Sequence, residues 1–177
     1  MPIETEVKIK IDAVEPVKQR LLEIKAELYK KRALEQDVFF DNKRKLEKSD
    51  QLLRLRDNIL LTYKGPKTLK QMKVRQEIEV MIDNKNNLVQ IFEKLGYIPS
   101  GKKEKYRESY VFGMTKICVD ETPMGNFIEI EGTKKSVITA AEKLGFSKKQ
   151  FIAKTYNALW DEHAGKNKIK GDMVFQK

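Results

Sequence analysis

The sequence predicts an α+β domain built on eight antiparallel strands with helices between them. Eight short segments alternate apolar and polar residues with a period of two, which is typical of strands, and most carry charge on the polar side. Four other segments place apolar residues at helical spacing. The chain has 177 residues, so we expect a single domain over 1–177, with a polar tail from 165 that follows neither pattern.

The first half of the chain supplies four predicted strands. These cover residues 3–11, 37–41, 53–56 and 60–64. In the first of them, Glu4, Glu6 and Lys8 lie on one face, and Val7 and Ile9 lie on the other. One face of this strand is therefore charged and the other is apolar.

The second half repeats the alternation in four more segments. These cover residues 74–80, 103–109, 116–120 and 127–131. In the last of them, Glu129 and Glu131 alternate with Ile128 and Ile130. The polar faces of the eight segments are dominated by charge, with acids on some strands and Lys or Arg on others.

Helical spacing appears over 16–28, 87–95, 137–144 and 148–164. Gly96 and Gly145 follow the second and third of these segments and predict their C-terminal ends. The order strand, helix, strand occurs once in each half, and a duplicated unit of this kind predicts a pseudo-twofold arrangement.

Two architectures fit strands that each have one charged face. The charged faces can point to water from a sandwich, or they can point into a closed barrel whose apolar outside is covered by helices. The whole set of strands favours the eight-stranded antiparallel β-barrel with helices packed outside. Charges of both signs reduce the cost of burial, and a charged ligand with its metal would complete the pairing.

Composition narrows the function classes. The net charge of +10 indicates an anionic partner without identifying it. Cys118 is the only cysteine, which excludes an intrachain disulfide and favours a cytoplasmic setting. No segment resembles a signal peptide or a membrane span. Because His163 is the only histidine, any metal would be held mainly by carboxylates, as Mg²⁺, Mn²⁺ or Ca²⁺ are.

The predicted charged faces suit a polyphosphate bound through a divalent cation. Arginine forks match phosphate oxygens, and carboxylates would repel this anion unless a cation bridged them. The basic candidates are Lys8, Arg54, Arg56, Lys64, Lys105 and Arg107. The acidic candidates are Glu4, Glu6, Asp120, Glu129 and Glu131, with Glu77 and Glu79 equally suited to buried ion pairs.

Each motif taken alone has a simpler interpretation. Glu4-x-Glu6-x-Lys8 also occurs on exposed strands, and Arg54-x-Arg56 could belong to a nucleic-acid surface. A basic nucleic-acid-binding barrel is the competing interpretation, but the aromatic residues fall mostly on apolar faces and offer no stacking platform. A third possibility is a module that binds a triphosphate without turning it over.

The motifs together resemble the CYTH superfamily of triphosphate tunnel enzymes over residues 3 to about 160. The matching segments are Glu4-Thr5-Glu6-Val7-Lys8, Leu53-Arg54-Leu55-Arg56, Leu61-Thr62-Tyr63-Lys64-Gly65-Pro66, Arg75-x-Glu77-x-Glu79, Lys105-x-Arg107 and Asp120-(x8)-Glu129-x-Glu131-Gly132. The resemblance is strongest to the class IV adenylyl cyclase branch.

This resemblance implies an eight-stranded antiparallel tunnel, Mg²⁺ or Mn²⁺ on the acidic candidates, and a triphosphate on the basic ones. It implies catalytic roles for Lys8, Arg54 and Glu131, and further positions at Arg75 and Lys154. The activity implied is conversion of ATP to cyclic AMP and pyrophosphate. The alternatives in the same tunnel are hydrolysis of inorganic triphosphate or of thiamine triphosphate. A homodimer is also implied.

Overall fold

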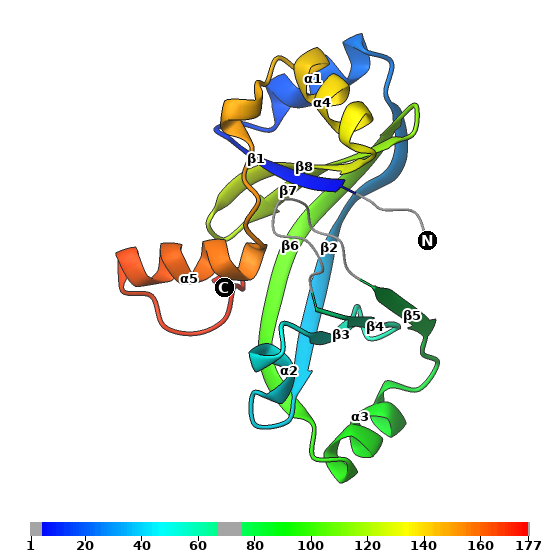
Figure 1. Cartoon of the computed structure of the whole chain (residues 1–177), viewed down its shortest axis with the longest axis vertical. Coiled ribbons are helices and arrows are strands. Elements are labelled where there is room, and N and C mark those ends of the chain that lie inside the picture. Colours follow the sequence, from blue (N-terminus) through cyan, green and yellow to red (C-terminus); the bar gives the residue numbers. More distant parts are fainter. Residues whose placement is uncertain (1–4, 67–75, 177) are drawn as a thin grey trace.

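The computed structural model describes residues 5–66 and 76–176 (Figure 1). Its strands are β1 (Thr5–Ile11), β2 (Glu27–Asp41), β3 (Leu52–Arg56), β4 (Leu60–Lys64), β5 (Glu77–Met81), β6 (Ile98–Phe112), β7 (Thr115–Thr122) and β8 (Gly125–Gly132). Within the described residues they form one antiparallel sheet in the order β1-β8-β7-β6-β2-β3-β4-β5.

Helices cover the apolar side of this sheet at both of its ends (Figure 1). The helical segments are α1 (Glu15–Glu23), α2 (Lys45–Lys48), α3 (Lys85–Lys94), α4 (Lys134–Lys143), the short 3₁₀ helix η1 (Lys148–Gln150) and α5 (Tyr156–Asn167). Among the described residues, no helix has the length and apolar character needed to cross a membrane.

The strand order confirms the predicted pseudo-twofold arrangement. The long strands β2 and β6 pair at the centre, and β3, β4 and β5 on one side correspond to β7, β8 and β1 on the other. The prediction of eight antiparallel strands in an α+β fold is confirmed. Closure into a barrel would join β1 to β5, and the residues described here show no ladder between these strands.

The apolar face of the sheet forms two hydrophobic cores. In the larger one, Ile9, Ile128 and Ile130 are fully buried against α1 and α4. In the smaller one, Phe40 packs edge-on against Phe92 of α3, with their ring centroids 5.0 Å apart. Because the strands alternate, burying one face under helices directs every charged candidate in the strands to the opposite face.

The helix predicted over 16–28 is shorter than its pattern indicated. It ends at Glu23, because Lys25 adopts a left-handed conformation with φ of 58° and the N–H of Ala26 closes the turn on Leu21 O at 2.9 Å. The chain then enters β2 at Glu27, ten residues before the predicted strand began. This extra length pairs with β6.

The helix predicted over 148–164 is also interrupted. Ile152 exchanges backbone hydrogen bonds with Lys8 of β1, at 3.1 and 2.8 Å, so this part of the chain is extended. Helical structure resumes only after Thr155, whose hydroxyl accepts the N–H of Ala158 at 3.1 Å. The apolar residues that suggested one long helix therefore belong to two separate segments.

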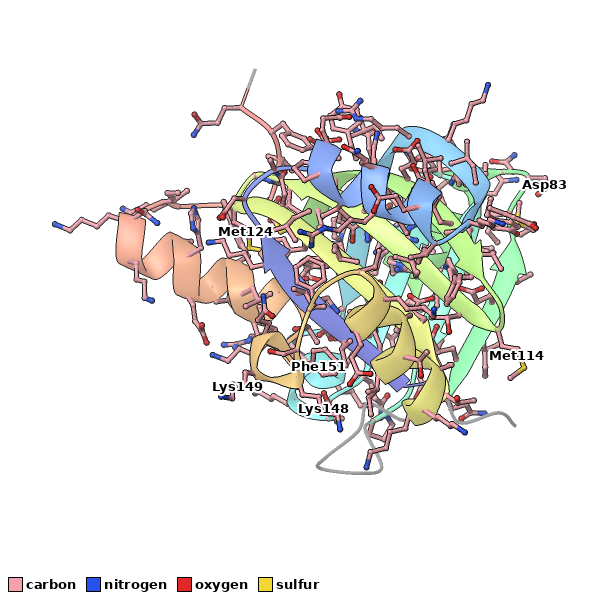
Figure 2. The ribbon with its side chains drawn as sticks, turned by 90° about the horizontal axis from the view of Figure 1, so that it is seen from above. Asp83, Met114, Met124, Lys148, Lys149 and Phe151 are labelled. Atoms are coloured by element: carbon pink, nitrogen blue, oxygen red, sulfur yellow. The ribbon has the colours of Figure 1, made fainter. Side chains whose placement is uncertain are left out.

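One helix does not lie outside the sheet as predicted. Tyr156, Trp160 and Ala164 of α5 pack against Met124 and Phe127, and Phe127 shares the charged face with Glu129. Figure 2 shows Met124 beside this helix. The cause is local: aromatic and sulfur-containing side chains replace charge at this end of the face, so α5 has an apolar surface to cover.

The C-terminal tail, whose sequence showed neither strand alternation nor helical spacing, lies beside β6. Met173 forms a parallel bridge with Lys103, and the N–H of Glu104 donates to Met173 O at 2.7 Å. Trp160 of α5 donates from its indole nitrogen to the carbonyl of Gly171 at 3.0 Å. The tail is thus fastened to both the sheet and the last helix.

Asp41 closes a turn and does not take part in the charged face. Its carboxylate accepts the backbone N–H groups of Asn42, Leu46 and Glu47 at 2.6, 3.0 and 3.0 Å. We expect Asp41→Ala to lower the free energy of unfolding by about 1–2 kcal/mol, because the first backbone N–H groups of α2 lose their acceptor. Urea unfolding of the variant and the wild type measures this, and equal stability of the two proteins would contradict it.

Candidate active site

Charged side chains of both signs cover one face of the sheet, on all eight strands. Residues directly opposite each other in antiparallel ladders share a face, so the strand register brings them together. The basic members are Lys8, Arg54, Arg56, Lys64, Lys103, Lys105, Arg107 and Lys116. The acidic members are Glu6, Glu35, Asp37, Glu77, Glu79, Asp120, Glu129 and Glu131. We call this surface the charged face.

Lys8 and Arg107 share the carboxylate of Glu129. Lys8 Nζ lies 2.9 Å from Glu129 Oε2 and also pairs with Glu6, while Arg107 Nη2 lies 2.8 Å from Glu129 Oε1. Burial opposes ionisation of Glu129, yet the charges of Lys8 and Arg107 hold its pKa well below the ordinary value. These buried charges therefore persist because they neutralise one another.

Glu131 lies at a more open position of the same face. It stands opposite Glu6 in the β1–β8 ladder, and Lys116 Nζ is 3.3 Å from its Oε2. Burial and the negative charge of Glu129 raise the pKa of Glu131. Neighbouring carboxylates with this mutual repulsion are the kind of group that a divalent cation stabilises.

The other half of the charged face is organised by Asp37. Its carboxylate accepts Arg56 Nε at 2.7 Å and lies 3.0 Å from Lys103 Nζ, and it is 2% exposed. Burial opposes ionisation here too, but Lys103 and Arg56 hold the pKa of Asp37 well below the ordinary value. Burial lowers the pKa of Lys103 to about 8.

Glu35 connects the two halves. Its Oε2 lies 3.2 Å from Arg56 Nη1 and 3.7 Å from Lys105 Nζ. Through these contacts the ion pairs around Asp37 and those around Asp120 form one continuous network.

Most of the predicted site residues meet on this face. Glu6, Lys8, Arg54, Arg56, Lys64, Lys105, Arg107, Asp120, Glu129 and Glu131 all belong to it, as do Glu77 and Glu79 at its exposed edge. Glu4 and Arg75 lie outside the described residues. The side chain of Lys154 is 54% exposed and pairs with Glu162 of α5.

Sequence reasoning left several members of the face out of the site. Lys103 and Lys116 lie in predicted strands at positions whose alternation places them on the charged side. Glu35 lies two residues before Asp37, so extending the predicted strand toward the N-terminus would have placed it on the same side. Thr62 also belongs here, since Arg54 Nη2 donates to its hydroxyl at 3.0 Å. For Tyr156 the local sequence carries no signal, because its position depends on how α5 packs.

The donor chemistry of the face fits a hard divalent cation. Glu6, Glu129 and Glu131 are neighbours on β1 and β8, and carboxylate oxygens are the preferred ligands of Mg²⁺ and Mn²⁺. In the described part of the chain no three acidic, histidine or cysteine side chains are already gathered as a metal centre. Lysines hold these carboxylates instead, so binding a cation requires their rearrangement.

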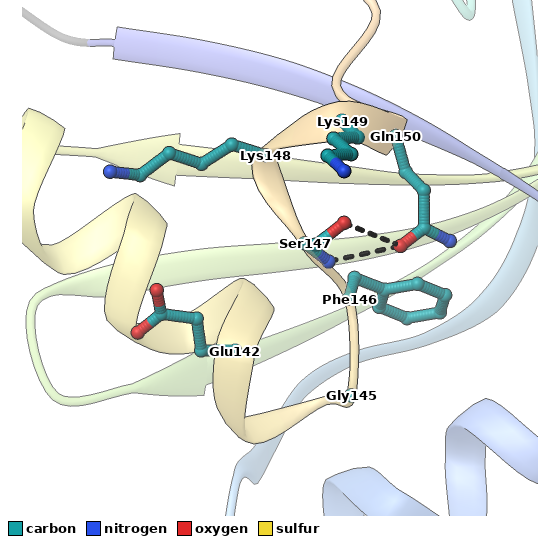
Figure 3. Close-up of a pocket in the computed structure, with 7 residues that line it drawn as sticks. All are labelled: Glu142, Gly145, Phe146, Ser147, Lys148, Lys149 and Gln150. Atoms are coloured by element: carbon teal, nitrogen blue, oxygen red, sulfur yellow. Dashed lines mark hydrogen bonds between the residues drawn. The ribbon is translucent and has the colours of Figure 1, made fainter.

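A surface hollow of about 750 Å³ lies elsewhere, at the C-terminal end of α4 (Figure 3). Its lining residues are Glu142, Gly145, Phe146, Ser147, Lys148, Lys149 and Gln150. Phe146 packs against the core beneath α1 and α4, so this hollow belongs to the helix-covered side. It takes no part in the charged face.

The part of the chain that contains this sheet also matches a known protein family. A family model described as the CYTH domain matches residues 2–156. The chain belongs to the CYTH domain family. The match includes every strand of the sheet, and thus the whole charged face of this CYTH domain.

Individual relatives agree with this assignment. A protein of Methanocaldococcus jannaschii, provisionally named an adenylate cyclase, is 35% identical over 175 residues, covering 89% of this CYTH domain chain and 98% of its own length. A structure from Vibrio parahaemolyticus, also provisionally an adenylate cyclase, superposes with a TM-score of 0.77 at 17% identity, covering 90% of this chain and 98% of that one.

A third comparison adds a different activity. A Hippeastrum protein, provisionally an adenylyl cyclase and described as having a dominant triphosphatase activity, superposes with a TM-score of 0.62 at 18% identity. The alignment covers 92% of this chain and 96% of that chain. At this identity, the likeness shows a shared CYTH fold.

Proposed function

We propose that this CYTH domain is a metal-dependent enzyme acting on a triphosphate, with conversion of ATP to cyclic AMP and pyrophosphate as its leading activity. The observation that carries the proposal is the buried face of paired charges. Lys8 is 2% exposed, Lys105 3% and Arg107 5%. Cations enclosed in this way suit a small, highly charged anion better than an extended nucleic acid, which binds surface charge.

The basic side chains would take the phosphate oxygens. They come from four strands, β1, β3, β4 and β6, and are Lys8, Arg54, Arg56, Lys64, Lys105 and Arg107.

 A fifth strand, β7, adds Lys116 beside Glu131. In the structure these cations are paired with carboxylates, and we infer that a triphosphate takes over part of that pairing. Catalytic roles for Lys8, Arg54 and Glu131 remain part of this proposal.

The carboxylates of β1 and β8 would hold Mg²⁺ or Mn²⁺. Glu6, Glu129 and Glu131 are the described candidates, with Glu4 preceding them in the sequence. A bound divalent cation would supply neutralisation of the phosphate charge that develops during transfer. The protein's own contribution is then to align the triphosphate and to place cations where the leaving pyrophosphate gains charge.

The proposed binding mode is a tunnel around the triphosphate. Ile152 pairs with the outer edge of β1 at Lys8. α5 covers the end of the face at Phe127. These features support an enclosed site, in which exclusion of water strengthens each contact between cation and phosphate.

Hydrolysis of a triphosphate is the second candidate, because the Hippeastrum neighbour with the same fold has a dominant triphosphatase activity. The two reactions differ in the atom attacked. In the cyclase reaction, the ribose 3′-oxygen bonds to the α-phosphorus and pyrophosphate leaves. In hydrolysis, water bonds to the terminal phosphorus, the bridging P–O bond breaks, and the diphosphate leaves while the attacked phosphorus is released as orthophosphate.

A product assay distinguishes the two. Purified protein would be given ATP, thiamine triphosphate and inorganic triphosphate in parallel, with Mg²⁺ and separately with Mn²⁺. We expect cyclic AMP and pyrophosphate in equal amounts from ATP. Orthophosphate without cyclic AMP would establish the hydrolase, and absence of any metal-dependent product would refute an enzymatic role.

The pKa of Lys103 predicts that binding of a triphosphate is coupled to proton uptake. A pKa of about 8 means that the ammonium is mostly deprotonated at pH 9, whereas a bound triphosphate favours the charged form. We therefore expect protein binding to inorganic triphosphate at pH 9 to take up a proton, which calorimetry in buffers of different ionisation enthalpy measures. Lys103→Arg, which stays charged, should remove this uptake, and equal uptake in the variant would contradict the assignment.

A further inference from the structure

Tyr156 links α5 to three charged groups of the site. It is 5% exposed, and its hydroxyl donates to Asp120 Oδ2 at 2.6 Å. The ammonium groups of Lys8 and Lys105 lie over its ring, 4.9 and 5.1 Å from the centroid. One side chain of α5 thus contacts groups from β1, β6 and β7, at distances typical of cation–π contacts and a short hydrogen bond.

Asp120 is fully engaged by donors of the chain itself. Arg107 donates from Nε to Oδ1 and from Nη2 to Oδ2, both at 2.6 Å, and Lys105 Nζ donates to Oδ2 at 3.2 Å. With the hydroxyl of Tyr156 this makes four contacts on two oxygens that are 0% exposed. A carboxylate offers about four lone-pair positions, so these contacts leave little capacity for a metal ion.

The charge states agree with this geometry. Burial opposes ionisation of Asp120, but Arg107 and Lys105 hold its pKa below the ordinary value, so the carboxylate is charged. Burial and the charge of Asp120 raise the pKa of Tyr156 well above the ordinary value, so the hydroxyl keeps its proton and remains a donor.

Glu131, on the neighbouring strand β8, is more exposed than Asp120 and is held less firmly. Its side chain is 24% exposed, and the cation beside it is Lys116, at 3.3 Å. A carboxylate of this kind can exchange a weak partner for a cation without leaving a buried donor unpaired. The two acids are therefore suited to different tasks, although both belong to the same sequence motif.

We propose that Tyr156 is a positioning residue, which fixes Asp120 so that this carboxylate orients Arg107 and Lys105 toward the triphosphate instead of ligating the metal. This inference rests on the proposed function and narrows it, because it removes Asp120 from the set of metal ligands. It also gives α5 a role in the site, since the helix supplies the group that completes the contacts of Asp120.

Tyr156→Phe tests the positioning role, because it removes the hydroxyl and keeps both the ring and the net charge. We expect inorganic triphosphate to bind about fivefold more weakly in saturating Mg²⁺, while the affinity for Mn²⁺ alone is unchanged. Tyr106→Phe, on the opposite face of β6, is the matched control and should bind as the wild type does. Unchanged triphosphate affinity in Tyr156→Phe would overturn the proposal.

A nuclear magnetic resonance measurement separates positioning from the proposed function. The Nε–H proton of Arg107 should exchange slowly with solvent in the wild type and faster in Tyr156→Phe, whether or not a triphosphate binds. If the wild type binds no triphosphate, the proposed function fails, and this proton still tests the contact network. Equal exchange in the two proteins would refute the positioning role.

A crystal structure with Mn²⁺ and inorganic triphosphate tests the role of Asp120 directly. We expect its carboxylate to remain hydrogen-bonded to Tyr156 and Arg107. An Asp120 oxygen within about 2.6 Å of the metal would make it a ligand and overturn the proposal.

Discussion

Replacing Glu131 with glutamine is expected to reduce metal-dependent turnover by roughly a hundredfold or more while leaving the fold intact. The reduction follows because an amide is a poorer ligand for a hard cation and neutralises less of its charge. Stability should change by less than about 1 kcal/mol, because burial and Glu129 already raise the pKa of Glu131 and glutamine has the shape of its neutral form. Initial rates at saturating Mg²⁺ and urea unfolding measure the two effects.

Glu121→Gln is the matched control for this variant. Glu121 is on the other face of β7, where it pairs with Arg32 near the surface. The same chemical change there should leave turnover at the wild-type level. If Glu131→Gln also kept full activity, the assignment of the charged face as the active site would be wrong.

Asp37→Asn is expected to lower the free energy of unfolding by about 3–5 kcal/mol. The carboxylate of Asp37 is almost completely buried and lies 2.7 Å from Arg56 Nε and 3.0 Å from Lys103 Nζ. Without its charge, these cations and Arg54 remain together in a buried environment with one fewer acid. Chemical unfolding of the two proteins at neutral pH measures the difference.

The exposed pair of Arg44 and Glu47 supplies the comparison. Their side chains are 72% and 60% exposed, so Glu47→Gln should change stability by less than about 1 kcal/mol. A loss of similar size in both variants would show that the cluster around Asp37 has no special contribution.

The effect of Asp37 should depend on pH. Because its pKa in the folded protein is well below the ordinary value of 3.8, its charge stabilises the fold fully above about pH 4. As the pH falls below 4, the unfolded chain takes up the proton first, and the stability from Asp37 is lost. The difference in unfolding free energy between wild type and Asp37→Asn should therefore shrink at low pH.

The sequence predicts the charged face well because strand alternation is a local property. In β8, Glu129 and Glu131 alternate with buried isoleucines, so their shared face follows from the sequence alone. The first half of β2 could not be found in this way. Its residues from Glu27 to Arg32 are exposed, so no apolar period marks the strand, and it exists because β6 pairs with it.

The contacts of α5 depend on tertiary structure and were not predictable. Nothing in the residues around Tyr156 indicates that its hydroxyl meets Asp120, which is 36 positions earlier in the chain. The break in the predicted helix has the same origin, because Ile152 is extended only where it bonds to Lys8. Elements at the end of the charged face are thus set by long-range contacts.

The pairing of β1 with β8 affects how this protein can fold as it is made. Ile9 and Ile128 are register partners, so β1 leaves the ribosome more than a hundred residues before the strand with which it pairs. At typical synthesis rates this takes on the order of ten seconds. During that time Ile9 and Ile11 have no sheet to enter, and such long-range pairing slows folding. Completion of the sheet is therefore a late event in synthesis, because β1 cannot pair before β8 has been made.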